Sequence, residues 1–180
     1  TTRNGVWVSI RHNNTRTTLM RKIFFLMALV YLAICVMFST VKASELNCLV
    51  EAVYYEARSE PFVAQLAVAN VVLERVRDER FPSTICEVVH QGRYNKKGQP
   101  IRHKCMFSYW CDGKPERMKE IEALKTAISV SEMAINGVIV EATVGATHYH
   151  ANYVRPHWRL AHTFMELGQL GKHIFYLDMR

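Results

Sequence analysis

Glu56 is the residue of this chain whose type and surroundings best suit catalysis. It stands in Tyr54-Tyr55-Glu56-Ala57-Arg58, at the end of an apolar stretch and beside two aromatic residues. Such neighbours remove solvent from a carboxylate, which raises its pKa and favours the protonated form. A protonated carboxylic acid can donate a proton to the leaving oxygen when a glycosidic bond is cleaved. A solvated surface glutamate paired with Arg58 is the plainer alternative.

Two histidines indicate a second kind of chemistry. His148 and His150 alternate with Tyr149, so their side chains share one face if this segment is a strand. With His157 or His162 they would supply three ligands for zinc. Polar residues of a half-buried strand are the simpler interpretation, and we expect no metal and no other cofactor.

Aromatic residues are candidates for a sugar-stacking cleft. They stand beside Gly, Asp and His residues in the second half of the chain: Tyr109, Trp110, Tyr149, Tyr153 and Trp158. Aromatic side chains lie more often in a core than in a cleft, so their spacing alone does not decide between the two.

Helices are expected to position most of these residues. Apolar residues at helical spacing predict one helix over 45–58 and a second over 62–77. Ser59 is expected to cap the second helix, and Glu60 to favour its positive N-terminal end. A third helix, amphipathic, is predicted over 115–136 and is followed by Gly137.

Strand patterns come late in the chain. Residues 138–144 are rich in β-branched residues, 145–150 continue with alternation, and 173–177 form another short strand. The long segment 86–114 carries turn residues, with an exposed turn at 96–99. Helices followed by a small late sheet predict an α+β fold.

The N-terminal part has the pattern of a targeting segment. Met20-Arg21-Lys22 precedes an apolar run over 23–40, and Val41-Lys42-Ala43 offers a small-residue cleavage site before Ser44. Residues 20–43 are therefore expected to be a signal peptide or a membrane anchor, and 44–180 the folded domain. Residues 1–19 are expected to be an upstream, non-native extension.

The charge of the chain lies mainly in this leader. The net charge is +7, from 23 Lys and Arg against 16 Asp and Glu, and residues 1–43 hold six basic and no acidic residues. The domain over 44–180 therefore has 17 basic and 16 acidic residues. We expect no nucleic-acid partner, since that would need a basic face on the domain.

Cysteine usage agrees with export. Cys35 lies in the leader, and the domain holds Cys48, Cys86, Cys105 and Cys111, an even number that suits an oxidising compartment. Four cysteines allow three pairings. In one of them Cys105 and Cys111 close a short loop, while Cys48 and Cys86 join the first helix to the region after the second. Free buried thiols are the alternative.

Five blocks of sequence, in order, cover nearly all of 46–176. They are 55–61 with 65–76, then 81–89, 106–113, 145–150 and 171–176. Together they resemble the SleB/CwlJ family of cell wall hydrolases. The chain departs from the family pattern at Ser59, where Gly is common, at Glu74, where Asn is usual, and at Met106, where Gln is usual.

The resemblance implies a mainly helical, lysozyme-like core with a small late β-sheet. It also implies an exported enzyme of the periplasm or cell envelope, with 44–180 as its catalytic domain. Its partner would be the glycan strands of peptidoglycan, cut between N-acetylmuramic acid and N-acetylglucosamine by lytic transglycosylation with Glu56 as catalytic acid. The residues expected to bind substrate are Tyr55, Gln65, Phe107, Ser108, Trp110, Asp112, Thr147, His148, Tyr149 and His150.

Two other functions fit parts of the pattern. A zinc-dependent amidase would cut the link between muramic acid and peptide with a metal-bound water, and a chelator would stop it. A non-catalytic wall-binding module would use the aromatic residues to bind peptidoglycan without releasing any fragment.

Overall fold

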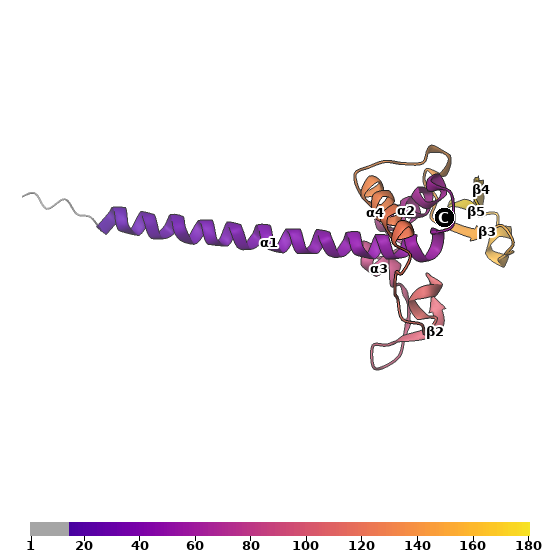
Figure 1. The fold of residues 1–180 in the computed structure, drawn as a ribbon, viewed down its shortest axis with the longest axis horizontal. Helices are drawn as coiled ribbons and strands as arrows, with labels where there is room; N and C mark the ends of the chain where they lie inside the picture. The colour runs from indigo at the N-terminus through magenta and orange to yellow at the C-terminus, as the bar shows by residue number, and fades with distance from the viewer. Residues whose placement is uncertain (1–14) are drawn as a thin grey trace, which may run out of the picture. The chain divides into compact units, whose positions relative to one another are not determined.

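The computed structural model describes residues 15–180, so residues 1–14 of the expected extension lie outside the described residues. The chain divides into two compact units, with the boundary between Val41 and Lys42. Each unit is described by itself below (Figure 1).

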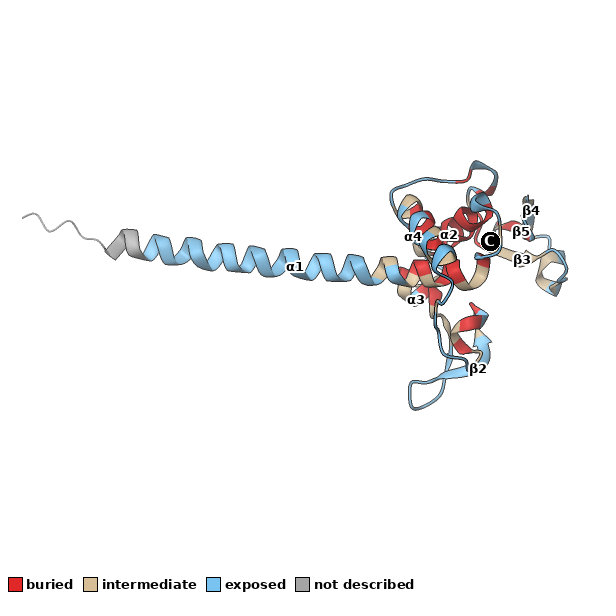
Figure 2. Ribbon diagram, in the orientation of Figure 1, coloured by how far each residue is buried: buried red, intermediate tan, exposed pale blue. Residues whose placement is uncertain are grey.

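The first unit is helical. Helix α1 (Thr15–Ala57) begins in it, and apolar side chains from Leu19 to Val41 are exposed (Figure 2). The stretch that starts at Leu19 is long and apolar enough to cross a membrane, although a signal sequence passes the same test. The helix predicted over 45–58 begins at Thr15 in the structure. No Gly or Pro stands within 15–57 to interrupt it.

Helices form the core of the second unit. The end of α1 packs with α2 (Phe62–Arg77), α3 (Ile85–Val89) and α4 (Ile121–Ile135). Helix α2 is the central one, since residues 64–72 are all buried, as the red ribbon in Figure 2 shows. Its bounds match the prediction. An almost wholly apolar helix must be surrounded by other elements, which agrees with its central position.

The helix ends differ from the prediction in three places. Pro61 is the N-cap of α2, so Ser59 does not cap it. The short helix α3 was missed, although Thr84 caps it by accepting a hydrogen bond from the Glu87 N–H. Helix α4 begins at Ile121 instead of 115, because the chain before it is held extended where the Glu120 N–H donates to the Tyr54 hydroxyl at 3.0 Å.

Two small antiparallel sheets complete the unit. Strands β1 (Gly92–Tyr94) and β2 (Pro100–Cys105) form a hairpin. Strands β3 (His148–Ala151), β4 (Phe164–Leu170) and β5 (His173–Asp178) form a sheet in the order β3-β5-β4. This arrangement confirms the α+β class and the late sheet.

The strand predictions hold only in part. Residues 138–144 are not a strand, because the Asn70 side chain bonds both Val138 O and the Val140 N–H, and a 3₁₀ helix follows at Glu141–Thr143. Strand β4 was missed because the alternation of its side chains is broken where the register shifts between Glu166 and Gly168.

Both disulfides are formed in one of the three possible pairings. Cys48 is bonded to Cys86, which joins α1 to α3, and Cys105 is bonded to Cys111. Cys35 is free and exposed. The first bond therefore ties α1 to α3 within the helical core.

Candidate active site

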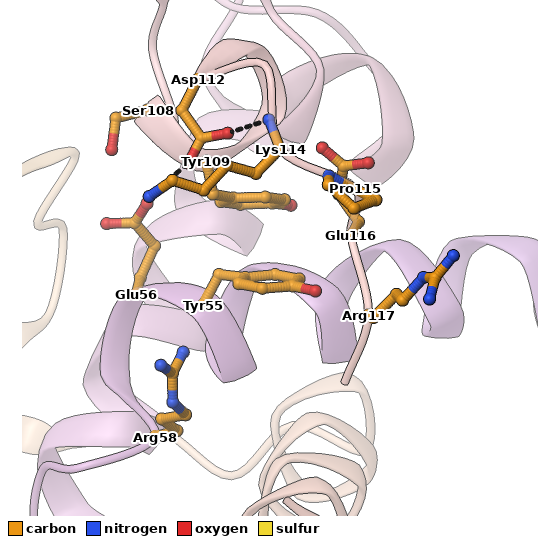
Figure 3. Close-up of a pocket in the computed structure, with 10 residues that line it drawn as sticks. All are labelled: Tyr55, Glu56, Arg58, Ser108, Tyr109, Asp112, Lys114, Pro115, Glu116 and Arg117. Atoms are coloured by element: carbon orange, nitrogen blue, oxygen red, sulfur yellow. Dashed lines mark hydrogen bonds and ion pairs between the residues drawn. The ribbon is translucent and has the colours of Figure 1, made fainter. Parts of the chain in front are cut away.

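A pocket of about 360 Å³ lies beside Glu56 (Figure 3). One wall is the end of α1, with Tyr55 and Glu56, and Arg58 directly after it. The other wall is the segment that runs from the 3₁₀ helix Ser108–Cys111 toward α4. This segment contributes Ser108, Tyr109, Asp112, Lys114, Pro115, Glu116 and Arg117.

The carboxyl group of Glu56 is held in a poorly solvated position. Glu56 is half-buried, and burial raises its pKa above the ordinary value of 4.5. The Tyr149 hydroxyl donates a hydrogen bond to Oε2 at 3.3 Å, and the Arg75 charge opposes the rise in pKa more weakly. No ion pair to Glu56 is found in the described part of the chain. The site therefore favours the protonated acid that proton donation requires.

Arg75 is a buried cation beneath the site. It is 5% exposed, its Nε donates to Thr147 O at 2.8 Å, and its guanidinium lies over the rings of Phe81 and Phe107. Burial lowers the pKa of Arg75, while the charge of Glu56 supports its protonated form. Arg75 therefore supplies positive potential near Glu56 without neutralising it through a direct pair.

Two tyrosines form the floor of the pocket. The rings of Tyr55 and Tyr109 are stacked with their centroids 4.7 Å apart, and Figure 3 shows them parallel. Tyr109 is 8% exposed, and burial is the main cause that raises its pKa. The stack joins α1 to the opposite wall, so it sets the width of the pocket at Glu56.

Two other carboxylates line the pocket, from Asp112 and Glu116. Asp112 Oδ1 accepts a hydrogen bond from the Lys114 N–H at 2.7 Å, and Oδ2 lies 3.7 Å from the Lys114 ammonium. Glu60 does not line the pocket, because its Oε2 accepts from the Lys172 N–H at 2.8 Å. Glu60 thus links the α1–α2 connection to the turn between β4 and β5, a contact that the predicted role at the helix start did not include.

The structure brings together only some of the residues expected to bind substrate. Tyr55, Ser108 and Asp112 line the pocket with Glu56, and Tyr149 reaches Glu56 from β3. The remaining ones lie elsewhere: Gln65 and Phe107 are buried, Trp110 stacks on His90 at 3.6 Å, and Thr147 accepts from Arg75.

The two histidines of β3 face an aromatic cluster around Trp158. The Trp158 ring lies 5.4 Å from that of His148 and 5.7 Å from that of His150. His150 also stacks on Tyr176, and its Nε2 lies 3.1 Å from the Tyr176 hydroxyl. Burial lowers the pKa of His148 to about 4. Within residues 15–180, no three His, Cys, Asp or Glu residues are grouped so that they could hold a metal ion.

Several residues that line the pocket were not predicted from the sequence. Arg58, Lys114, Pro115, Glu116 and Arg117 line the pocket, and they lie in segments with no strong pattern of their own. Arg75 did carry a usable signal, since a charged residue inside an otherwise apolar helix must have a specific partner when it is buried.

The pH profile of activity should report the environment of Glu56. If it is the general acid, kcat/KM should fall as the pH rises through its raised pKa. Tyr149→Phe removes a hydrogen bond that lowers this pKa, so the alkaline limb should move to higher pH. The measurement is kcat/KM against pH for both proteins, and an unmoved limb would contradict this role of Tyr149.

The same pKa has a consequence for stability. A carboxyl whose folded pKa is raised stabilises the fold fully below its ordinary value of 4.5 and loses that contribution as the pH rises through the folded pKa. Tyr149→Phe should extend the range over which the free energy of unfolding declines, which denaturant titrations at several pH values would reveal.

Comparisons with known proteins agree with this arrangement. Residues 59–176 match the Cell Wall Hydrolase family, a region that begins three residues after Glu56. The spore cortex-lytic enzyme of Bacillus cereus is 29% identical over 133 residues, which are 73% of this chain and 44% of that protein. The spore cortex-lytic enzyme of Halalkalibacterium halodurans is 28% identical over 73% of this chain and 34% of its own length. The chain thus spans less than half of these curated relatives.

Solved structures show the same fold. The catalytic domain of the Bacillus cereus SleB protein aligns with a TM-score of 0.54 at 28% identity, covering 73% of this chain and 88% of that one. The catalytic domain of the germination-specific lytic transglycosylase SleB from Bacillus anthracis gives a TM-score of 0.54 at 28% identity, covering 73% and 93%. With two thirds of its residues inside the matched region, this chain belongs to the cell wall hydrolase family of the SleB type.

Proposed function

We propose that this protein cleaves the glycan strands of peptidoglycan as a lytic transglycosylase, with Glu56 as general acid and base. The observation that carries the proposal is the position of Glu56: half-buried, free of ion pairs in the described part of the chain, and open to a pocket of about 360 Å³. The family to which the chain belongs supports the same substrate class.

The first step needs a proton donor. Glu56, whose protonated form is favoured by burial, would donate its proton to the oxygen that links N-acetylmuramic acid to N-acetylglucosamine. An oxocarbenium-like centre then develops on the sugar ring. The Tyr149 hydroxyl, which donates to Glu56 Oε2, would hold the carboxyl group in place as its charge appears.

The second step needs only one carboxylate. Glu56, now a base, would take the proton of the muramic acid 6-hydroxyl as that oxygen attacks the same sugar. An intramolecular nucleophile has a high effective concentration, so no second carboxylate is required to hold a water molecule. Asp112, another carboxylate that lines the pocket, accepts a hydrogen bond from the Lys114 N–H and lies 3.7 Å from the Lys114 ammonium.

The exposed apolar part of α1 suits either a signal peptide or an anchor in the membrane. We place the folded domain outside the cytoplasm, in the periplasm or cell envelope, and its two disulfides support an oxidising location. The N-terminus of the protein isolated from cells distinguishes the two cases, since Ser44 marks cleavage and residue 20 in the membrane fraction marks an anchor.

Mass spectrometry of fragments released from purified peptidoglycan tests the proposed reaction. We expect muropeptides with 1,6-anhydro ends, because the nucleophile is the 6-hydroxyl of the sugar itself. Reducing ends would instead show hydrolysis by water, and free stem peptides would show an amidase. If a chelator abolished activity, the assignment as a transglycosylase would be wrong and the zinc-dependent amidase would take its place.

A further inference from the structure

The β1–β2 hairpin concentrates the positive charge of the folded domain. Residues 92–105 hold five Lys and Arg residues and no Asp or Glu: Arg93, Lys96, Lys97, Arg102 and Lys104. The rest of 44–180 has 12 basic and 16 acidic residues, so it is acidic overall. The nearly neutral total therefore conceals a basic hairpin on an acidic domain.

These cations are free to meet a partner. Every residue from Arg93 to Lys104 is exposed, and the hairpin around β2 is mostly pale blue in Figure 2. In the described residues, Arg93, Lys96, Lys97 and Lys104 form no ion pair. Like charges this close repel one another and do not stabilise a hairpin, so its folding alone gives no reason for them.

The pairing of β1 with β2 is irregular within this basic segment. Gly92 pairs with Cys105 and Tyr94 with Pro100, so the four residues 101–104 oppose Arg93 alone. Within this bulge His103 has φ of 58°, a left-handed conformation that few residues other than glycine adopt. Bulges of this kind redirect side chains and occur near binding sites.

The hairpin is joined directly to the pocket wall. The Cys105–Cys111 bond connects the end of β2 to the 3₁₀ helix that carries Ser108 and Tyr109. Arg102 Nε donates to the backbone oxygen of Asp112 at 3.0 Å, and Asp112 lines the pocket. A polymer bound at Glu56 that extends past this wall would therefore run along the hairpin.

We propose that the hairpin over 92–105 binds the carboxylates of the peptide stems of peptidoglycan, next to the glycan strand in the pocket. This inference rests on the proposed function and names the substrate as glycan that still bears its stems. Stems carry free carboxylates at regular intervals along the glycan, which complements a row of unpaired Lys and Arg residues. The contact would guide the strand into the pocket and would weaken as salt is added.

Two other anionic partners fit the hairpin less well. Its tip, Asn95 to Gln99, has no apolar side chain to enter a lipid surface, and Ile101 is the one large aliphatic side chain of the hairpin. Nucleic-acid strands are held by stacking successive bases on several aromatic rings, but the hairpin offers one exposed tyrosine ring, Tyr94, and the neighbouring Trp110 ring already stacks on His90 at 3.6 Å.

Co-sedimentation with insoluble sacculi tests the proposal. The full-length chain in detergent, with Glu56→Gln to prevent digestion, would be mixed with sacculi freed of phosphate polymers by hydrofluoric acid. A second batch of sacculi would have its carboxylates converted to neutral amides with carbodiimide and ethanolamine. The hairpin variant combines Arg93→Gln, Lys96→Gln, Lys97→Gln and Lys104→Gln, which remove four charges that form no ion pair within the described residues.

A matched control removes four exposed cations elsewhere that form no ion pair in the described residues, by Lys42→Gln, Lys119→Gln, Arg155→Gln and Lys172→Gln. We expect the hairpin variant to bind untreated sacculi on the order of 10-fold more weakly, since each exposed ion pair contributes little by itself. The control should bind as the parent does, and the parent should lose a similar factor on amidated sacculi.

Three results would overturn the proposal: equal binding by the hairpin variant and the parent, equal binding of the parent to amidated and untreated sacculi, or a larger loss of binding by the hairpin variant on duplex DNA than on untreated sacculi. Cleavage is not read in this assay. A failure of the transglycosylase reaction would appear in the released fragments, whereas a failure of the hairpin proposal appears only in the binding.

Discussion

Glu56→Gln is expected to reduce glycan cleavage by roughly 10²- to 10⁴-fold, the range that a general acid contributes. The amide matches the carboxyl group in size and keeps an oxygen that can accept the Tyr149 hydrogen bond, but it has no proton to transfer. The fold should remain intact, because a neutral amide relieves the cost of holding a carboxylate where burial disfavours its charge. The measurements are the rate of fragment release and the free energy of unfolding.

Glu60→Gln is the matched control. Glu60 lies four residues further along the chain and undergoes the same chemical change, but its Oε2 accepts from the Lys172 N–H and it does not line the pocket. Glutamine keeps an oxygen for that bond, so activity should stay close to that of the wild type. A severe loss in both variants would indicate a hydrolytic pair of carboxylates, and near-normal activity of Glu56→Gln would exclude the proposed role of Glu56.

The helical core could be predicted from the sequence because its signal is local. Helix α2 is apolar almost throughout, and its bounds Phe62–Arg77 agree with the expected range. The errors arose where distant residues decide the backbone. The Asn70 side chain occupies Val138 O and the Val140 N–H, which prevents a segment with high strand propensity from pairing as a strand.

The residues alone predicted the site only where one short segment carries the chemistry, whereas Ser108 and Asp112 of the opposite wall were expected from the family resemblance. Glu56 and Tyr55 are adjacent in sequence, and both line the pocket. The opposite wall depends on how the chain folds back after the Cys105–Cys111 loop, which no periodic pattern records. Tyr149 was expected to bind substrate, but its hydrogen bond to Glu56 spans 93 residues and could not be read from spacing.

Removing the Cys48–Cys86 disulfide should destabilise the domain by about 4 kcal/mol, because the bond closes a loop of 38 residues in the unfolded chain. The double variant Cys48→Ala/Cys86→Ala should therefore unfold at a much lower urea concentration than the wild type under non-reducing conditions. Cys35→Ala is the control, since Cys35 is free and exposed and its loss should leave the midpoint unchanged. An equal midpoint for the double variant and the wild type would contradict the prediction.

The two disulfides should differ in what their loss affects. Cys105 and Cys111 are only six residues apart, so Cys105→Ala/Cys111→Ala should cost about 2 kcal/mol by the same entropic argument. Its loop carries Ser108 and Tyr109, however, and both line the pocket beside Glu56. Freeing this wall should lower kcat/KM even at temperatures where the domain stays fully folded, because misplaced binding groups cost activity directly. The Cys48–Cys86 variant, assayed while folded, should retain more of its activity, so the two pairs separate stability from the positioning of the site.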